Sequence, residues 1–414
     1  MPAFDAELYL RLLGERELLG GGDHYHPHHG SPLQQAADAL VAVDRIDADA
    51  AASITDDYAR AGALRGVHGL RRFGRWGIPG SVAAPATPAL GPRRTVPVQQ
   101  RIETFSGELS LEYVSLSPHG VSLGARVRWA PGAMQALHRQ GHTGMDELTL
   151  ADDRGTTTEA HFNGGGGDDE WRGHYQGEEP LAVDTAWIEV AGTRIDLPEV
   201  ENRVEVWIED LPPRPPAWRH LWHAVAAADH FGGRDIQPAL NALRAAGAID
   251  ADDPQLEQLQ AVAGQHPRAP AGMRGHRGGG TGLPEPWVSV GRFAGTGRQG
   301  TIVVGAATPV FDGVSVAVNA LEADSESFEA SVEIAPGVLG RPSSSERIAW
   351  WAADDRGNHH HGTMGSWSGG GDHDEGTVEF SGGIDPRARW IDVMPTTPTK
   401  RAVIRVPLGD GEAT

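Results

Sequence analysis

Four histidines gather in one short segment near the beginning of the chain. Residues 23–29 contain an aspartate followed by His24, His26, His28 and His29. Neutral imidazole is a ligand for zinc, nickel and copper, and a neighbouring carboxylate adds a further donor. The four histidines are therefore candidate ligands of a divalent cation, which would be the cofactor. A polar loop that binds metal only incidentally is the favoured interpretation of this segment.

Two glycine-rich acidic segments are the second group of candidate ligands. Residues 164–170 end in Asp168, Asp169 and Glu170, and residues 369–375 contain Asp372, His373 and Asp374. Oxygen ligands of this kind bind calcium, but the spacing of an EF-hand loop is missing. We therefore weigh a cation site against solvated hairpin tips, which glycine and aspartate also favour.

A histidine run precedes the second acidic segment. Residues 359–361 are all histidine, whereas the corresponding stretch of the first half is Thr156-Thr157-Thr158. In a strand, alternate side chains point to opposite faces, so His359 and His361 share one face and His360 lies on the other. A function common to both halves therefore cannot depend on this run.

Tryptophan is abundant, with 12 residues against five tyrosines. Trp171 and Trp367 flank the acidic segments, and we expect them to contact a partner. Trp187 and Trp390 lie within strand-like sequence, and we expect them in the core.

The chain lacks a complete catalytic constellation in its sequence. In Gly365-Ser366-Trp367-Ser368-Gly369 the central position of a nucleophile elbow is tryptophan rather than serine. The 414 residues contain no cysteine, which excludes disulfides, thiolate zinc fingers and cysteine nucleophiles. A hydrolase that uses carboxylates or a histidine-bound metal is the least favoured hypothesis for the function.

The chain resembles itself at a spacing of about 200 residues. Ordered matches join 46–49 with 249–252, 120–123 with 313–316, 151–155 with 353–357, 165–170 with 369–375, and 187–190 with 390–393. Matches kept in the same order indicate an internal duplication.

Each half begins with amphipathic segments and continues with short alternating segments separated by Gly, Pro and Asp. The fold class expected is α+β, with each half a small helical unit followed by an antiparallel β-sandwich. This pattern resembles immunoglobulin-like sandwiches in outline. The expected domains are helical units at 1–78 and 217–266 and sandwiches at 95–211 and 286–410.

Net charge and hydropathy exclude some classes of binding partner. The net charge of −21 disfavours nucleic acid, and no run of about 18 apolar residues predicts a membrane span. We expect a cytoplasmic, non-enzymatic interaction or scaffolding protein that binds another protein through its duplicated β-surfaces. The alternative is a cation- or carbohydrate-binding protein that uses the acidic segments.

Overall fold

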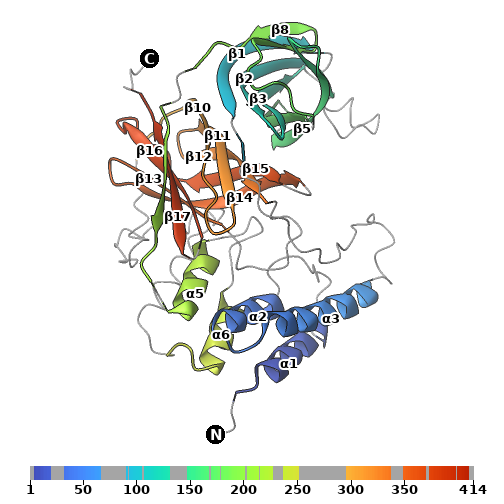
Figure 1. Ribbon diagram of the computed structural model, residues 1–414, viewed down its shortest axis with the longest axis vertical. Coiled ribbons are helices and arrows are strands. Elements are labelled where there is room, and N and C mark those ends of the chain that lie inside the picture. Colours follow the sequence, from blue (N-terminus) through green and yellow to red (C-terminus); the bar gives the residue numbers. More distant parts are fainter. Residues whose placement is uncertain are drawn as a thin grey trace.

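A computed structural model describes most of the chain. The described residues are 4–19, 32–66, 90–91, 93–104, 107–130, 147–166, 169–177, 179–200, 203–213, 215–226, 236–250, 295–336, 348–369, 373–397 and 399–409. They form two antiparallel β-sheets and a group of helices (Figure 1). The β-rich class with a few helices is therefore confirmed.

The helices come from both halves of the chain. They are α1 (Ala6–Leu19), α2 (Pro32–Ala42), α3 (Ala48–Gly66), α5 (Pro216–Ala226) and α6 (Gln237–Ala245). Asp47 caps α3, because its Oδ1 accepts hydrogen bonds from the backbone N–H groups of Asp49 and Ala50. The helices share one core, in which Leu40 of α2 and Leu243 of α6 are fully buried. The two expected helical units thus form a single layer.

Sheet A has eight strands in the order β1-β2-β3-β6-β5-β4-β7-β8. These are β1 (Arg94–Thr104), β2 (Gly107–Ser117), β3 (Gly120–Trp129), β4 (Leu148–Asp152), β5 (Thr157–Gly166), β6 (Glu170–Gly177), β7 (Trp187–Val190) and β8 (Thr193–Asp196). All neighbouring strands are antiparallel.

Sheet B has nine strands in the order β10-β11-β12-β15-β14-β13-β16-β17-β9. These are β10 (Gly300–Ala307), β11 (Ser315–Ala323), β12 (Ser327–Ala335), β13 (Ala349–Asp354), β14 (His359–Gly369), β15 (Asp374–Ser381), β16 (Trp390–Thr396), β17 (Lys400–Pro407) and β9 (Glu205–Asp210). β9 falls within the range expected for the first β-domain, yet it pairs with β17 at the edge of the second sheet.

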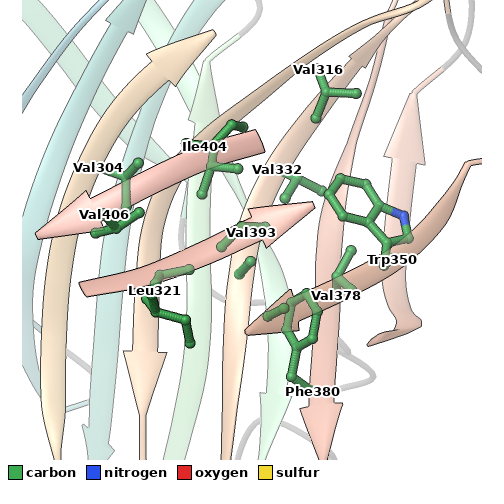
Figure 2. Packing of buried hydrophobic residues seen from close by; sticks show 14 of the residues in the cluster. Val304, Val316, Leu321, Val332, Trp350, Val378, Phe380, Val393, Ile404 and Val406 are labelled. Carbon is green, nitrogen blue, oxygen red and sulfur yellow. The ribbon is translucent and has the colours of Figure 1, made fainter. Parts of the chain in front are cut away.

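The expected immunoglobulin-like sandwich is not what the strands form. A sandwich has two separate facing sheets, whereas the described strands of each half form one continuous hydrogen-bonded ladder that curls on itself (Figure 1). Each curled sheet encloses its own core. Figure 2 shows the core of sheet B, where Trp350 and Phe380 pack among the branched aliphatic side chains of Val316, Leu321, Val332, Val378, Val393, Ile404 and Val406.

The strand order is the same in both sheets once β9 is set aside: β1–β8 occupy the places of β10–β17. We call two residues equivalent when they occupy the same register position in the two ladders. The sequence matches 151–155 with 353–357 and 187–190 with 390–393 join equivalent positions. The match of 120–123 with 313–316 does not, because residues 120–123 lie in β3 and residues 313–316 lead into β11.

The matched Asp-Asp-Arg-Gly segments are hairpin turns with the same hydrogen bonds. Oδ1 of Asp152 accepts from the N–H groups of Arg154 and Thr156, and Oδ1 of Asp354 accepts from those of Arg356 and Asn358. Gly155 and Gly357 close the turns with φ of 81° and 84°, values that favour glycine.

The helical layer packs on sheet B. Trp351 of β13 and Val403 of β17 belong to the same buried cluster as the helices. His361 packs beside Trp351 with ring centroids 5.1 Å apart, whereas His360 lies in the sheet core against Phe328. The predicted alternation of the histidine run is therefore confirmed. None of the described helices is long and apolar enough to cross a membrane.

Candidate functional site

The most concentrated group of buried polar side chains lies where the two sheets meet. We call this contact the inter-sheet seam; it joins the outer faces of β1, β2, β3 and β6 to those of β10, β11, β12 and β15. β12 shows how it forms: Phe328, Ala330 and Val332 point into the core of sheet B, while the alternate residues Glu329, Ser331 and Glu333 face the seam.

A buried ion pair anchors one end of the seam. Arg93, just before β1, donates through Nη1 and Nη2 to the two carboxylate oxygens of Glu333, each at 3.0 Å. Only 2% of the Arg93 side chain and 3% of the Glu333 side chain are exposed. Burial opposes ionisation of Glu333, but the guanidinium of Arg93 holds the pKa of that carboxyl below its usual value. The pair therefore binds the sheets together in its charged form.

The ion pair continues into a chain of hydrogen bonds between side chains. Asn319 of β11 donates through its Nδ2 to Glu333 at 3.0 Å and accepts from the hydroxyl of Ser115 in β2 at 3.1 Å. The hydroxyls of Ser115 and Thr95 lie 3.0 Å apart. Nearby, the Tyr113 hydroxyl donates to Ser331 at 3.0 Å, and burial raises the pKa of Tyr113. Tyr113 therefore stays neutral in this setting.

The seam has approximate twofold symmetry. Glu112 of β2 and Asn319 of β11 are equivalent, because each occupies the register shift of its strand. Asn319 contacts Ser115 across the seam, and Glu112 accepts a hydrogen bond from Thr301 across the seam. The equivalent of Ser115 is Glu322, which lies close enough to Glu112 to be affected by its charge. Reciprocal contacts of this kind characterise isologous interfaces.

The charges on the two sides of the seam differ in sign. Glu333 and Glu375 of sheet B are paired across β12 and β15, and their equivalents in sheet A are Arg126 and Arg172. The arginines contact acidic groups of their own sheet, since Arg126 lies 3.1 Å from Glu112 and Arg172 lies 3.2 Å from Glu170. The second acidic segment of the sequence therefore contributes Glu375 to the seam, and the first contributes Glu170 close to it.

Three glutamates form a row on the seam face of sheet B. Glu322 of β11 pairs with Glu329 of β12, which pairs with Glu379 of β15. Burial, with the nearby charges of Glu112 and Glu329, raises the pKa of Glu322 to about 8. Burial and the charge of Glu379 raise the pKa of Glu329 to about 7. Glu322 and Glu329 therefore retain protons near neutral pH.

Two histidines belong to the same region. His174 of β6 is 4% exposed, and burial lowers its pKa to about 4, so the imidazole is neutral. Its Nε2 has no hydrogen-bond partner among the described residues. His373 lies with its ring centroid 5.0 Å from that of His119 and its Nε2 3.5 Å from Oε1 of Glu375. That contact with Glu375 raises the pKa of His373.

The predicted cation ligands are only partly placed. His24, His26, His28 and His29, and also Asp168 and Asp372, lie outside the described residues. The side chain of Glu170 lies near three arginines, Asp169 accepts a backbone hydrogen bond from Trp129, and Asp374 is fully buried. Within the described part of the chain, no group of three or more His, Asp or Glu side chains is arranged to hold a metal ion.

Two of the four tryptophans singled out in the sequence lie elsewhere than expected. Trp171 and Trp367 are half-buried and pack against the cores of their sheets, Trp171 with its ring edge-on to Trp129 at 5.5 Å. Trp187 and Trp390 were expected in the core, and this is wrong, because the neighbouring residues Ile188 and Ile391 fill those positions. Trp187 and Trp390 lie half-buried on the outer face of their sheets.

Each outward tryptophan carries a stacked arginine. Arg194 lies 4.7 Å from the ring centroid of Trp187, and its equivalent Arg405 lies 4.9 Å from that of Trp390. Arg389 stacks on Trp390 as well, at 4.7 Å. Cation–π contacts of this type hold a large ring in place on a surface.

The sequence did not single out the seam residues Arg93, Tyr113, Glu322, Glu329 and Glu333. The alternation of Glu329, Ser331 and Glu333 with apolar residues was a readable signal for a two-faced strand. It did not distinguish a solvated polar face from a buried one.

No protein-family model matches the chain, and no curated protein matches it. Among solved structures, one similar chain is the crystal structure of the conserved domain protein from Bacillus anthracis. The two chains are 8% identical, and the comparison covers 73% of this chain and 77% of that chain, with a TM-score of 0.19. A score of this size carries no argument about fold or function.

Proposed function

We propose that this chain is a non-enzymatic scaffold that binds a protein partner on the outer face of β4, β5, β7 and β8 in sheet A. One observation carries the proposal: this face presents exposed side chains, whereas the equivalent face of sheet B packs against the helical layer. The outer face of these strands is thus buried under the helices in sheet B and exposed in sheet A.

The residues at equivalent positions support this comparison. Trp351 and Ala349 of β13 are buried against the helices, and their equivalents in the first half are Thr149 and Glu147, both exposed. A polar, exposed face is suited to a partner that binds and dissociates, since interfaces between separately stable proteins are more polar than permanent ones.

Trp187 with its stacked Arg194 is the expected centre of the contact. Tryptophan and arginine are enriched among the residues that dominate binding energies. Glu147, Glu159 and Glu189 add exposed carboxylates to the same face, so the partner is expected to present basic residues. This assignment moves the expected contact from Trp171 and Trp367 to a ring that faces outward.

A pull-down from the source cell with the tagged full chain tests the proposal. The parent protein should recover a stoichiometric partner, and Trp187→Ala should reduce recovery at least tenfold. Trp390→Ala is the matched control, because it removes the equivalent ring from sheet B, and it should recover the partner normally. Equal loss in both variants, or none in either, contradicts the proposed surface.

The same experiment addresses the cation alternative. A chelator should leave recovery unchanged if the surface of sheet A is sufficient. Loss of the partner on chelation would instead support a role for the histidine segment 23–29 or the acidic segments.

We also propose that the two halves arose by tandem duplication. The common strand order of the two sheets and the matched turns at 152–155 and 354–357 support it. A duplicated unit whose copies pair through reciprocal contacts explains why the helices of both halves share one core.

A further inference from the structure

The row of glutamates at the seam is unusual because like charges lie directly opposite one another. Glu322, Glu329 and Glu379 are consecutive register partners across three antiparallel strands. Ionised side chains in such positions repel each other and destabilise the sheet. The equivalent row of sheet A is Ser115, Ser122 and Gln176, which are all neutral. The charge is therefore particular to sheet B.

The groups packed around the row do not neutralise it fully. Glu322 faces Glu112 of β2, Arg126 of β3, Arg172 of β6 and Glu329 of β12. Glu329 faces Glu379 and Thr377 of β15, and the Tyr113 hydroxyl of β2 lies close enough to Glu322, Glu329 and Glu375 to be affected by their charges. Both arginines already contact other carboxylates, Arg126 that of Glu112 and Arg172 that of Glu170. Packing of the two sheets against each other therefore favours the protonated, uncharged forms of Glu322 and Glu329.

We propose that the inter-sheet seam is a proton-dependent joint, in which Glu322 and Glu329 hold protons while the sheets are packed and release them as the sheets separate. Separation exposes both carboxyls to water, where their ordinary acidity returns. By linkage, conditions that remove the protons must favour the separated arrangement. The ion pair of Arg93 and Glu333 stays charged throughout and provides a fixed attachment at the other end of the seam.

This inference is independent of the proposed partner surface. The seam uses the outer faces of β1–β3 and β6, whereas the proposed partner surface uses β4, β5, β7 and β8. One proposal can fail without the other.

Distance measurement by double electron–electron resonance tests the joint in the full chain. The protein contains no cysteine, so Thr149→Cys on sheet A and Val310→Cys on sheet B give two unique spin-label sites, both exposed. The interspin distribution is expected to be narrow at pH 6 and to become longer and broader by pH 9, with a midpoint between pH 7 and pH 8.

The matched variant is Glu322→Gln with Glu329→Gln, which keeps the shape of each side chain but cannot ionise. It should retain the pH 6 distribution at pH 9. Glu199→Gln, an exposed glutamate that follows β8, is the control and should behave as the parent protein. If the double variant does not fold, Glu329→Gln alone should shift the midpoint upward. Identical parent distributions at pH 6 and pH 9, or the same change in parent and double variant, would overturn the proposal.

Discussion

At the scale of single residues, the seam is held by polar groups whose partners come from the other sheet. Arg93 and Glu333 are the extreme case, since both side chains are almost completely buried. A buried ion pair adds little net stability relative to a well-packed apolar pair, but removing one partner leaves a buried charge uncompensated. The pair therefore matters for how the sheets fit together more than for how tightly they bind.

Arg93→Met tests this at one position. The substitution leaves Glu333 buried opposite an apolar side chain, and it should lower the free energy of unfolding by about 3–5 kcal/mol, measured by urea denaturation. Adding Glu333→Gln should recover part of the loss, because the remaining group is neutral. Arg154→Ala breaks the exposed pair with Asp184 and should leave the unfolding midpoint unchanged. An Arg93→Met protein as stable as the parent would contradict the role of the pair.

At the scale of elements, the seam requires close approach of backbones. Gly305 of β10 has φ of +57°, and a Cβ placed there would lie 2.9 Å from Cβ of Thr95 in β1. Gly313 has a similar φ of +77°, but a Cβ there would meet nothing within 4 Å. Both glycines need a left-handed backbone conformation, but only Gly305 lies against a residue of the other sheet.

Comparing the two alanine variants isolates the contribution of that contact. Gly313→Ala should cost about 1–2 kcal/mol of unfolding free energy from the left-handed backbone alone. Gly305→Ala should cost about 1–3 kcal/mol more, because β10 must also move away from β1. Thermal unfolding of both proteins provides the measurement. Equal destabilisation would mean that β1 and β10 are not tightly packed.

The sequence predicted local structure better than it predicted packing. The helical segments and the alternation of the histidine run follow from residue type and spacing, which act over a few residues. Trp187 was misplaced because a strand has two faces and Ile188, next to it, competes for the inner one. Glu329 and Glu333 were missed because burial of a polar face depends on a sheet some 200 residues away.

At the scale of the whole molecule, the acids and bases of the seam set how stability depends on pH. Glu322 and Glu329 have pKa values of about 8 and about 7 when folded, above the ordinary value of 4.5. Between pH 4.5 and pH 8 the folded state thus binds more protons than the unfolded state through these groups, and their contribution to stability falls as pH rises. His174 acts oppositely, because its pKa is lowered to about 4 and its contribution is lost as pH falls below 6.5.

The melting temperature of the parent protein should decrease from pH 6.5 to pH 8.5, because folded Glu322 and Glu329 hold more protons there than His174 binds in the unfolded state. The Glu322→Gln and Glu329→Gln double variant should lose most of this decrease, because it removes the two groups that release protons there. Differential scanning calorimetry at closely spaced pH values measures both profiles. A parent profile that is flat or rises over this window would mean that both carboxyls are already ionised in the folded state, so that packing of the sheets does not retain their protons.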